Sequence, residues 1–90
     1  MSTIAPADQW GPFALDLRPA ERLARLRALR TLVRLHCGPR GAGLWSLLAV
    51  AEVAPDPTIL RCAVDALDTL ASLDRRRVLA SYAALNHAPA

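Results

Sequence analysis

The sequence contains no lysine: all 11 basic residues are arginine, and eight residues are acidic, so the formal net charge is +3. Arginine does not lose its proton in proteins, and the basicity of the chain therefore reflects a surplus of only three permanent charges. The lack of lysine also excludes a phosphate-binding P-loop, which needs Lys and then Ser or Thr after its last glycine. The glycine-rich stretch 38–43 is therefore interpreted as a loop between antiparallel helices.

Cysteines and long apolar runs are also scarce. The only two cysteines are Cys37 and Cys62, and in a reducing compartment we expect two buried thiols and no disulfide. The longest apolar stretch, residues 42–53, contains a glycine, a serine and a glutamate and is shorter than the roughly 20 residues that cross a bilayer. Because no basic segment followed by an apolar run begins the chain, we expect no secretion signal, no membrane segment and a cytoplasmic location.

The composition favours one small folded domain. The chain has 90 residues, and 53% of them are hydrophobic, which argues against disorder over most of its length. No stretch alternates apolar and polar residues as a half-buried strand would, and no repeat is visible at a period of 20 to 50 residues. The prediction is an all-α fold, specifically a small four-helix bundle-like single domain with an irregular N-terminal arm.

Helical periodicity and end signals place the elements. Pro19 suits the first turn of a helix, and Asp56 with Pro57 forms a second start signal. Because no Gly or Pro separates the last two helices, one long helix over 57–86 is the alternative to a break at Ser72. The predicted division is an arm over 1–17, a helical domain over 18–87 with helices at about 19–37, 44–54, 57–71 and 74–86, and a tail over 88–90.

The first helix is predicted to be the central one. Its leucines recur every third residue, and because each residue turns the helix by about 100°, they wind around it and predict an apolar arc of about half the circumference. The arc is predicted to contain Leu26, Leu29, Val33, Ala28, Leu32 and Leu35. We expect the stems of Arg22 and Arg25 to cover apolar surface while their guanidinium groups reach water.

The remaining side chains are predicted to be distributed as follows. Trp10 and Phe13 of the arm lie across the helical body, and Trp45 is the largest core residue of the second helix. The third helix exposes a net acidic stripe of Arg61, Asp65, Asp68 and Thr69, and the fourth buries Val78, Leu79, Tyr82 and Leu85 while it exposes Arg76, Arg77 and Ser81.

The residues that could carry out catalysis or hold a metal form no recognisable constellation. His36 and Cys37 are adjacent on a helix, so they point about 100° apart and cannot act as a base and nucleophile pair. A metal site built from these two residues, Cys62 and His87 would lack every common ligand spacing, such as CxxC or HExxH. We therefore predict no enzyme activity, no metal and no cofactor.

Two binding interpretations are left. Arg27, Arg30 and Arg34 fall at i, i+3 and i+7 and form a basic ridge, with no acid on the same face to neutralise it. Together with the run 75–77, this ridge suits phosphate groups. A helix-turn-helix would, however, use the third helix for recognition, and that helix is acidic outside. A small DNA- or RNA-binding regulator is therefore the second choice.

The first choice is a non-enzymatic protein-protein interaction module. It would bind a larger protein or nucleoprotein complex and regulate or inhibit it sterically, as adaptors, antitoxin-type regulators and mobile-element inhibitors such as anti-CRISPR proteins do; this analogy rests on class alone. The chain is expected to be a monomer or a homodimer. The predicted binding residues are Arg27, Arg30, Arg34, Arg76, Arg77 and Trp10.

Overall fold

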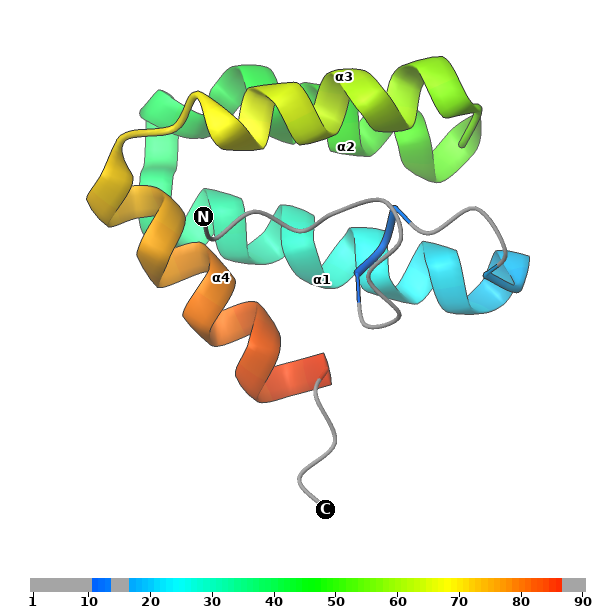
Figure 1. Cartoon of the computed structure of the whole chain (residues 1–90), viewed down its shortest axis with the longest axis horizontal. Coiled ribbons are helices and arrows are strands. Elements are labelled where there is room, and N and C mark those ends of the chain that lie inside the picture. Colours follow the sequence, from blue (N-terminus) through cyan, green and yellow to red (C-terminus); the bar gives the residue numbers. More distant parts are fainter. Residues whose placement is uncertain (1–10, 14–16, 87–90) are drawn as a thin grey trace.

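The computed structural model describes residues 11–13 and 17–86, and within these residues every regular element is helical. The elements are α1 (Pro19–Cys37), the 3-10 turn η1 (Gly38–Gly41), α2 (Ala42–Val53), α3 (Pro57–Asp68) and α4 (Ser72–Asn86) (Figure 1). Because η1 joins α1 to α2 without interruption, the four α-helical segments form three continuous helical runs. The predicted all-α class is confirmed. In the described part of the chain, none of the helices combines the length and the apolar character that crossing a membrane requires.

The local start signals act as predicted. Pro19 occupies the first turn of α1, and Asp56 caps α3 by accepting a hydrogen bond at 3.0 Å from the backbone N–H of Ile59. α2 and α4 each begin two residues earlier than the sequence indicates, at Ala42 and Ser72.

The break between α3 and α4 is also present, so a single long helix over 57–86 is wrong. Arg75 accounts for the break physically. Its Nη1 donates to the carbonyl oxygens of Asp68 at 2.9 Å and Leu70 at 3.1 Å, where α3 ends. These carbonyls would otherwise need the backbone N–H groups of a continuing helix.

The reversal between α1 and α2 is tighter than the predicted loop over 38–43. Gly38 has φ of 57° and its N–H donates to the carbonyl of Arg34, which ends α1. Gly41 is buried, and a Cβ at this position would lie 2.7 Å from Cγ1 of Val33 and 2.8 Å from Cβ of Cys37. The stretch is therefore a 3-10 turn that presses its backbone onto α1 and leads directly into α2.

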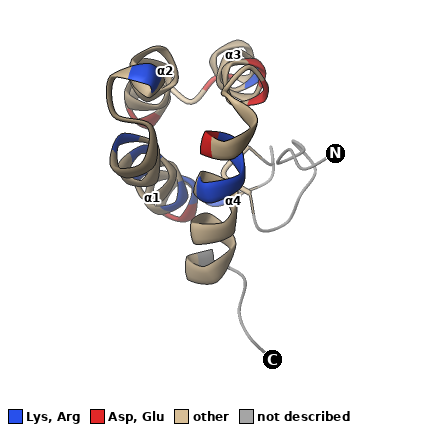
Figure 2. Cartoon of the chain, turned by 90° about the vertical axis from the view of Figure 1, so that its left-hand side faces the viewer, with Lys and Arg blue, Asp and Glu red and all other residues tan. Residues whose placement is uncertain are grey.

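The helices pack as a chain of neighbours. α1 contacts α2 and α4 extensively, and α2 contacts α3. α2 and α3 run side by side along one side of α1, whereas α4 crosses α1 obliquely and points away from the other two (Figures 1 and 2). This arrangement does not confirm a four-helix bundle, in which all helices would lie nearly parallel or antiparallel.

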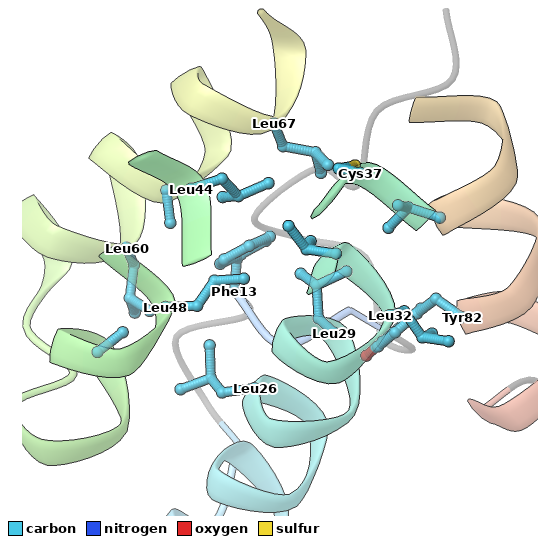
Figure 3. Close-up of a cluster of buried hydrophobic side chains, with 14 residues drawn as sticks. Phe13, Leu26, Leu29, Leu32, Cys37, Leu44, Leu48, Leu60, Leu67 and Tyr82 are labelled. Carbon is cyan, nitrogen blue, oxygen red and sulfur yellow. The ribbon is translucent and has the colours of Figure 1, made fainter. Parts of the chain in front are cut away.

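The core draws side chains from every helix and from the segment before α1. Phe13 lies in the middle of this cluster and is almost completely buried, as predicted (Figure 3). The cluster consists of Phe13, Leu26, Leu29, Leu32, Val33, Cys37, Leu44, Leu48, Ala51, Leu60, Ala63, Leu67, Val78 and Tyr82. Trp10 and most of the predicted arm over 1–17 lie outside the described residues, as does the tail over 88–90.

Two arginines of α1 hold the segment that carries Phe13. Arg22 Nη1 donates to the carbonyl of Pro12 at 3.1 Å, and Arg25 Nη1 donates to the carbonyl of Gly11 at 3.2 Å. The expectation that both guanidinium groups reach water is wrong for Arg22, which is only 7% exposed. The buried carbonyl needs a donor, and the guanidinium provides one without leaving the apolar surface.

Two leucines that the sequence assigns to the core are exposed instead. Leu35 of α1 is 71% exposed and Leu85 of α4 is 68% exposed. Each step of three residues turns a helix by about 300°, so the leucine series on α1 drifts by about 60° per step and Leu35 ends far from Leu29. The oblique crossing of α4 covers α1 on one side only, and the predicted arc is therefore too wide.

The two glycines that flank Ala42 are predicted to respond oppositely to alanine. Gly41→Ala places a methyl group against Val33 and Cys37, and it should lower the free energy of unfolding by about 1–3 kcal/mol, the usual effect of overpacking. Gly43 lies in α2 with no atom within 4 Å of its built Cβ, so Gly43→Ala should raise that free energy by about 0.5–1 kcal/mol. Urea denaturation of both variants measures the difference. Equal effects would contradict the close approach at Gly41.

Candidate functional site

The predicted basic ridge lies in the seam between α1 and α2. The three ridge arginines occupy the flank of α1 next to α2, and Trp45 and Glu52 face them from α2, where their spacing of seven residues puts them on the same side. The two helices run antiparallel (Figure 1). Arg34 therefore lies beside Trp45 at one end of the seam, and Arg27 lies beside Glu52 at the other end.

Glu52 neutralises part of this ridge. Its carboxylate accepts two hydrogen bonds from Arg30, one from Nε to Oε2 and one from Nη2 to Oε1 at 3.1 Å. Arg27 Nε lies 3.6 Å from Oε1 of the same carboxylate, and the Arg27 side chain is 64% exposed. The prediction of a ridge without an acidic neighbour is therefore wrong. The acid does not lie on α1 itself, and only antiparallel packing brings it to the arginines.

Trp45 is a half-buried member of this seam, so its prediction as the largest core residue is wrong. The guanidinium carbon of Arg30 lies 5.0 Å from the centre of its rings, and that of Arg34 lies 5.8 Å away. Both distances are in the range of cation-π attraction. Trp45 still packs against the edge of the core. Its indole is thus held between the apolar interior and two positive charges.

A surface pocket of about 550 Å³ opens at the Trp45 end of the seam. It is lined by Arg34, Gly38, Pro39, Ala42, Trp45 and Ser46. Arg34 is exposed and has no ion pair among the residues that the structure describes. The pocket therefore combines an aromatic surface, a guanidinium group and a hydroxyl. These groups suit an apolar side chain that is followed or preceded by a carboxylate.

The structure does not join the other predicted residues to this seam. Arg76 and Arg77 are exposed on α4, and α4 packs on the opposite flank of α1, where Nε2 of His36 lies 3.0 Å from Oγ of Ser81. Figure 2 shows a basic stretch of α4, coloured blue, on a helix separate from α1. Trp10 lies outside the described residues. The predicted set therefore contains one assembled cluster, at Arg27, Arg30 and Arg34.

The side chains with nucleophilic or metal-binding chemistry are dispersed over the described residues. Cys37 is buried, and burial, with a smaller contribution from the charge of Asp74, raises the pKa of its thiol. The expectation that both cysteines are buried is wrong for Cys62, which is exposed; both are free thiols. Within residues 11–13 and 17–86, no group of three His, Cys, Asp or Glu side chains is placed to hold a metal ion. His87 lies outside this range.

Asp74 is a buried charged residue that the sequence analysis did not identify. It is 4% exposed, and its carboxylate accepts hydrogen bonds from Arg40 Nε at 2.8 Å and Nη2 at 2.9 Å. The hydrogen bond from Arg40 lowers the pKa of Asp74, and the charges of Arg40, Arg77 and His36 act in the same direction against the effect of burial. One signal was available. Asp74 shares a helix face with the buried residues Val78 and Tyr82, and a buried acid needs a partner.

We predict that this ion pair makes the fold sensitive to acid. Because the folded state holds the pKa of Asp74 below its unfolded value of about 3.9, its contribution to stability is present above that value and is lost as the pH falls through the folded pKa. Asp74→Asn removes the titrating group. The urea midpoint of the wild type should therefore fall more steeply than that of the variant as the pH is lowered from about pH 5 through the folded pKa.

Asp65→Asn is the control for this measurement, because it removes an exposed carboxylate from α3. An Asp74→Asn protein that keeps the full acid dependence of the wild type would show that the ion pair with Arg40 does not cause it.

Comparison with known proteins provides no further assignment. The chain matches no known family model, no curated protein and no solved structure.

Proposed function

We propose that this chain is a non-enzymatic interaction module that binds an acidic surface of a larger protein or nucleoprotein complex and regulates it by steric occupancy. The seam between α1 and α2 carries the proposal. Two of its three guanidinium groups, those of Arg27 and Arg30, pair with the one carboxylate of Glu52. A surplus of two positive charges therefore lies beside a half-buried indole and an open pocket. A regulator of the adaptor, antitoxin or anti-CRISPR type would work through such a surface.

The residue types and their preorganisation support binding to a protein. Arg and Trp are the side chains that most often dominate the energy of protein interfaces. Arg30 is held by Glu52 and by the ring of Trp45, and Trp45 is held by the core. Binding would therefore immobilise few additional side chains, and the entropy that association costs would be small.

Nucleic-acid binding is the weaker alternative. Since Arg30 is engaged by Glu52, the ridge presents only Arg27 and Arg34 to a polyanion. Few phosphate contacts would result, whereas affinity for nucleic acid rises with the number of phosphates that are neutralised. The acidic side chains Asp65 and Asp68 are exposed on α3, as predicted, and they would repel the same ligand.

The decisive variant is Arg27→Glu with Arg34→Glu, since both side chains are exposed and neither is needed for the pair between Arg30 and Glu52. In a quantitative pull-down from a host lysate, this variant should retain at least about tenfold less of the proteins that the wild type retains. The reason is that like charges then face the acidic surface of the partner. Arg18→Glu with Arg61→Glu makes the same change in net charge at exposed positions away from the seam and should retain these proteins.

Two further measurements separate the remaining interpretations. Arg76→Glu with Arg77→Glu tests the predicted residues on α4, and loss of the partner with this variant alone would place the interface there. Retention of the same proteins by the wild type and by the Arg27 and Arg34 variant would refute the proposal for the seam. Tight binding to duplex DNA with a steep loss of affinity in salt would favour the nucleic-acid alternative.

A further inference from the structure

A row of Ser46, Val50 and Val53 runs along α2 beside the seam, and its two valines form an apolar strip. The three residues follow at i, i+4 and i+7, so they share one face of the helix. Val50 is 48% exposed and Val53 is 87% exposed. On the helix surface this row lies about 100° around from Trp45 and Glu52, on the side away from the core. Two valines are thus left in solvent next to the most basic part of the molecule.

The apolar strip lies beside one end of the basic ridge. The ridge spans seven residues, Arg27 to Arg34, which corresponds to about 10 Å along a helix axis. The strip of Val50 and Val53 flanks Glu52, which pairs with Arg27 and Arg30. Since α1 and α2 lie side by side (Figure 1), the surface consists of a positive strip, an apolar strip at its Glu52 end and the Trp45 pocket at its other end.

We propose that this surface receives an amphipathic helix of the partner, with acidic residues along one edge and apolar residues along the next. This inference rests on the proposed function and specifies its partner. Acidic side chains at i, i+3 or i+4, and i+7 on such a helix have the same spacing along the axis as the three ridge arginines on α1. Two of them can therefore pair with Arg27 and Arg34 at the same time. The spacing of an extended strand, about 3.3 Å per residue, does not follow the ridge in this way.

The charges of the surface select an acidic helix. Arg34 has no ion pair within the described part of the chain, and Arg27 is 3.6 Å from a carboxylate that Arg30 already engages through two hydrogen bonds. Both therefore have donors for a new carboxylate. A polyanion such as DNA could use the arginines but would bury no apolar surface on Val50 and Val53. The apolar strip thus distinguishes a protein helix from a nucleic acid.

The pocket at the Trp45 end supplies an anchor position. Its volume of about 550 Å³ is sufficient for a leucine or phenylalanine side chain from the partner helix. Arg34 and Trp45 both line it, so an apolar side chain there would be adjacent to an acidic one that reaches Arg34.

A selection from a peptide library tests this inference without knowledge of the natural partner. The library displays helix-favouring peptides of 16 residues, and the probe is the full-length wild-type chain. Selected peptides are expected to carry Asp or Glu at i, i+3 or i+4 and i+7, with Leu or Phe in the adjacent row. Amide chemical shifts should change mainly at residues 27–34 and 45–53 when such a peptide binds.

Matched variants then identify the two strips. Arg27→Glu with Arg34→Glu should lower the affinity for the selected peptides by at least about tenfold. Val50→Ser with Val53→Ser should lower it by about threefold or more. Leu35→Ser is the control for the valines, because Leu35 is an equally exposed apolar residue on another face of α1. It should leave the affinity unchanged.

Several results would overturn the inference. These are a selection that yields no peptide, selected peptides that bind in an extended form, and equal affinity for the valine variant and the wild type. Loss of self-association in the valine variant, measured by light scattering, would instead assign the strip to a second copy of this chain. None of these outcomes affects the pull-down with the arginine variants, so the proposed function can hold while the helix inference fails.

Discussion

The close approach of the η1 backbone to α1 is the constraint on which the rest of the structure depends. At Gly41 there is no space for a side chain between the turn, Val33 and Cys37. Gly38, which has a positive φ, ends α1 three residues before Gly41. The reversal that results places α2 directly alongside α1 with opposite direction. Trp45 and Glu52 therefore meet arginines that lie 11 to 25 residues away in the sequence, and α3 packs beside α2.

Arginine supplies most of the polar connections that hold this small fold together. Arg22 and Arg25 bind the backbone of the segment that carries Phe13, and Arg30 joins α1 to α2. Arg40 binds Asp74 of α4, and Arg75 binds the end of α3. A guanidinium group can do this because it offers five donors in a planar fork and keeps its charge when it is partly buried. These five arginines make contacts within the fold.

The candidate site consists of what these structural contacts leave exposed. Arg34 keeps donors in solvent beside Trp45 and Arg27 keeps them beside Glu52, while the pair of Arg30 and Glu52 fixes the geometry between them. Net charge alone would have assigned the same importance to Arg76 and Arg77, which lie on α4, and to the arginines that support the core. The local surplus of positive charge, with two exposed valines next to it, defines the surface more narrowly than the composition does.

The sequence by itself determined the class of the fold, the start of α1, the cap of α3 and the outward acidic face of α3, because short-range helix geometry and end signals decide these features. It also placed Phe13 in the core, since a large aromatic ring in a small chain has few other places to go. Only the tertiary structure decided that Glu52 pairs with Arg27 and Arg30, that Trp45 lies at the surface between guanidinium groups and that Leu35 faces solvent. These outcomes depend on the direction of α2 relative to α1 and on the oblique crossing of α4. Both depend on the backbone contact at Gly41, on the hydrogen bonds of Arg75 to the end of α3 and on the pair between Arg40 and Asp74, which are 34 residues apart in the chain. None of these contacts leaves a periodic signal in the sequence.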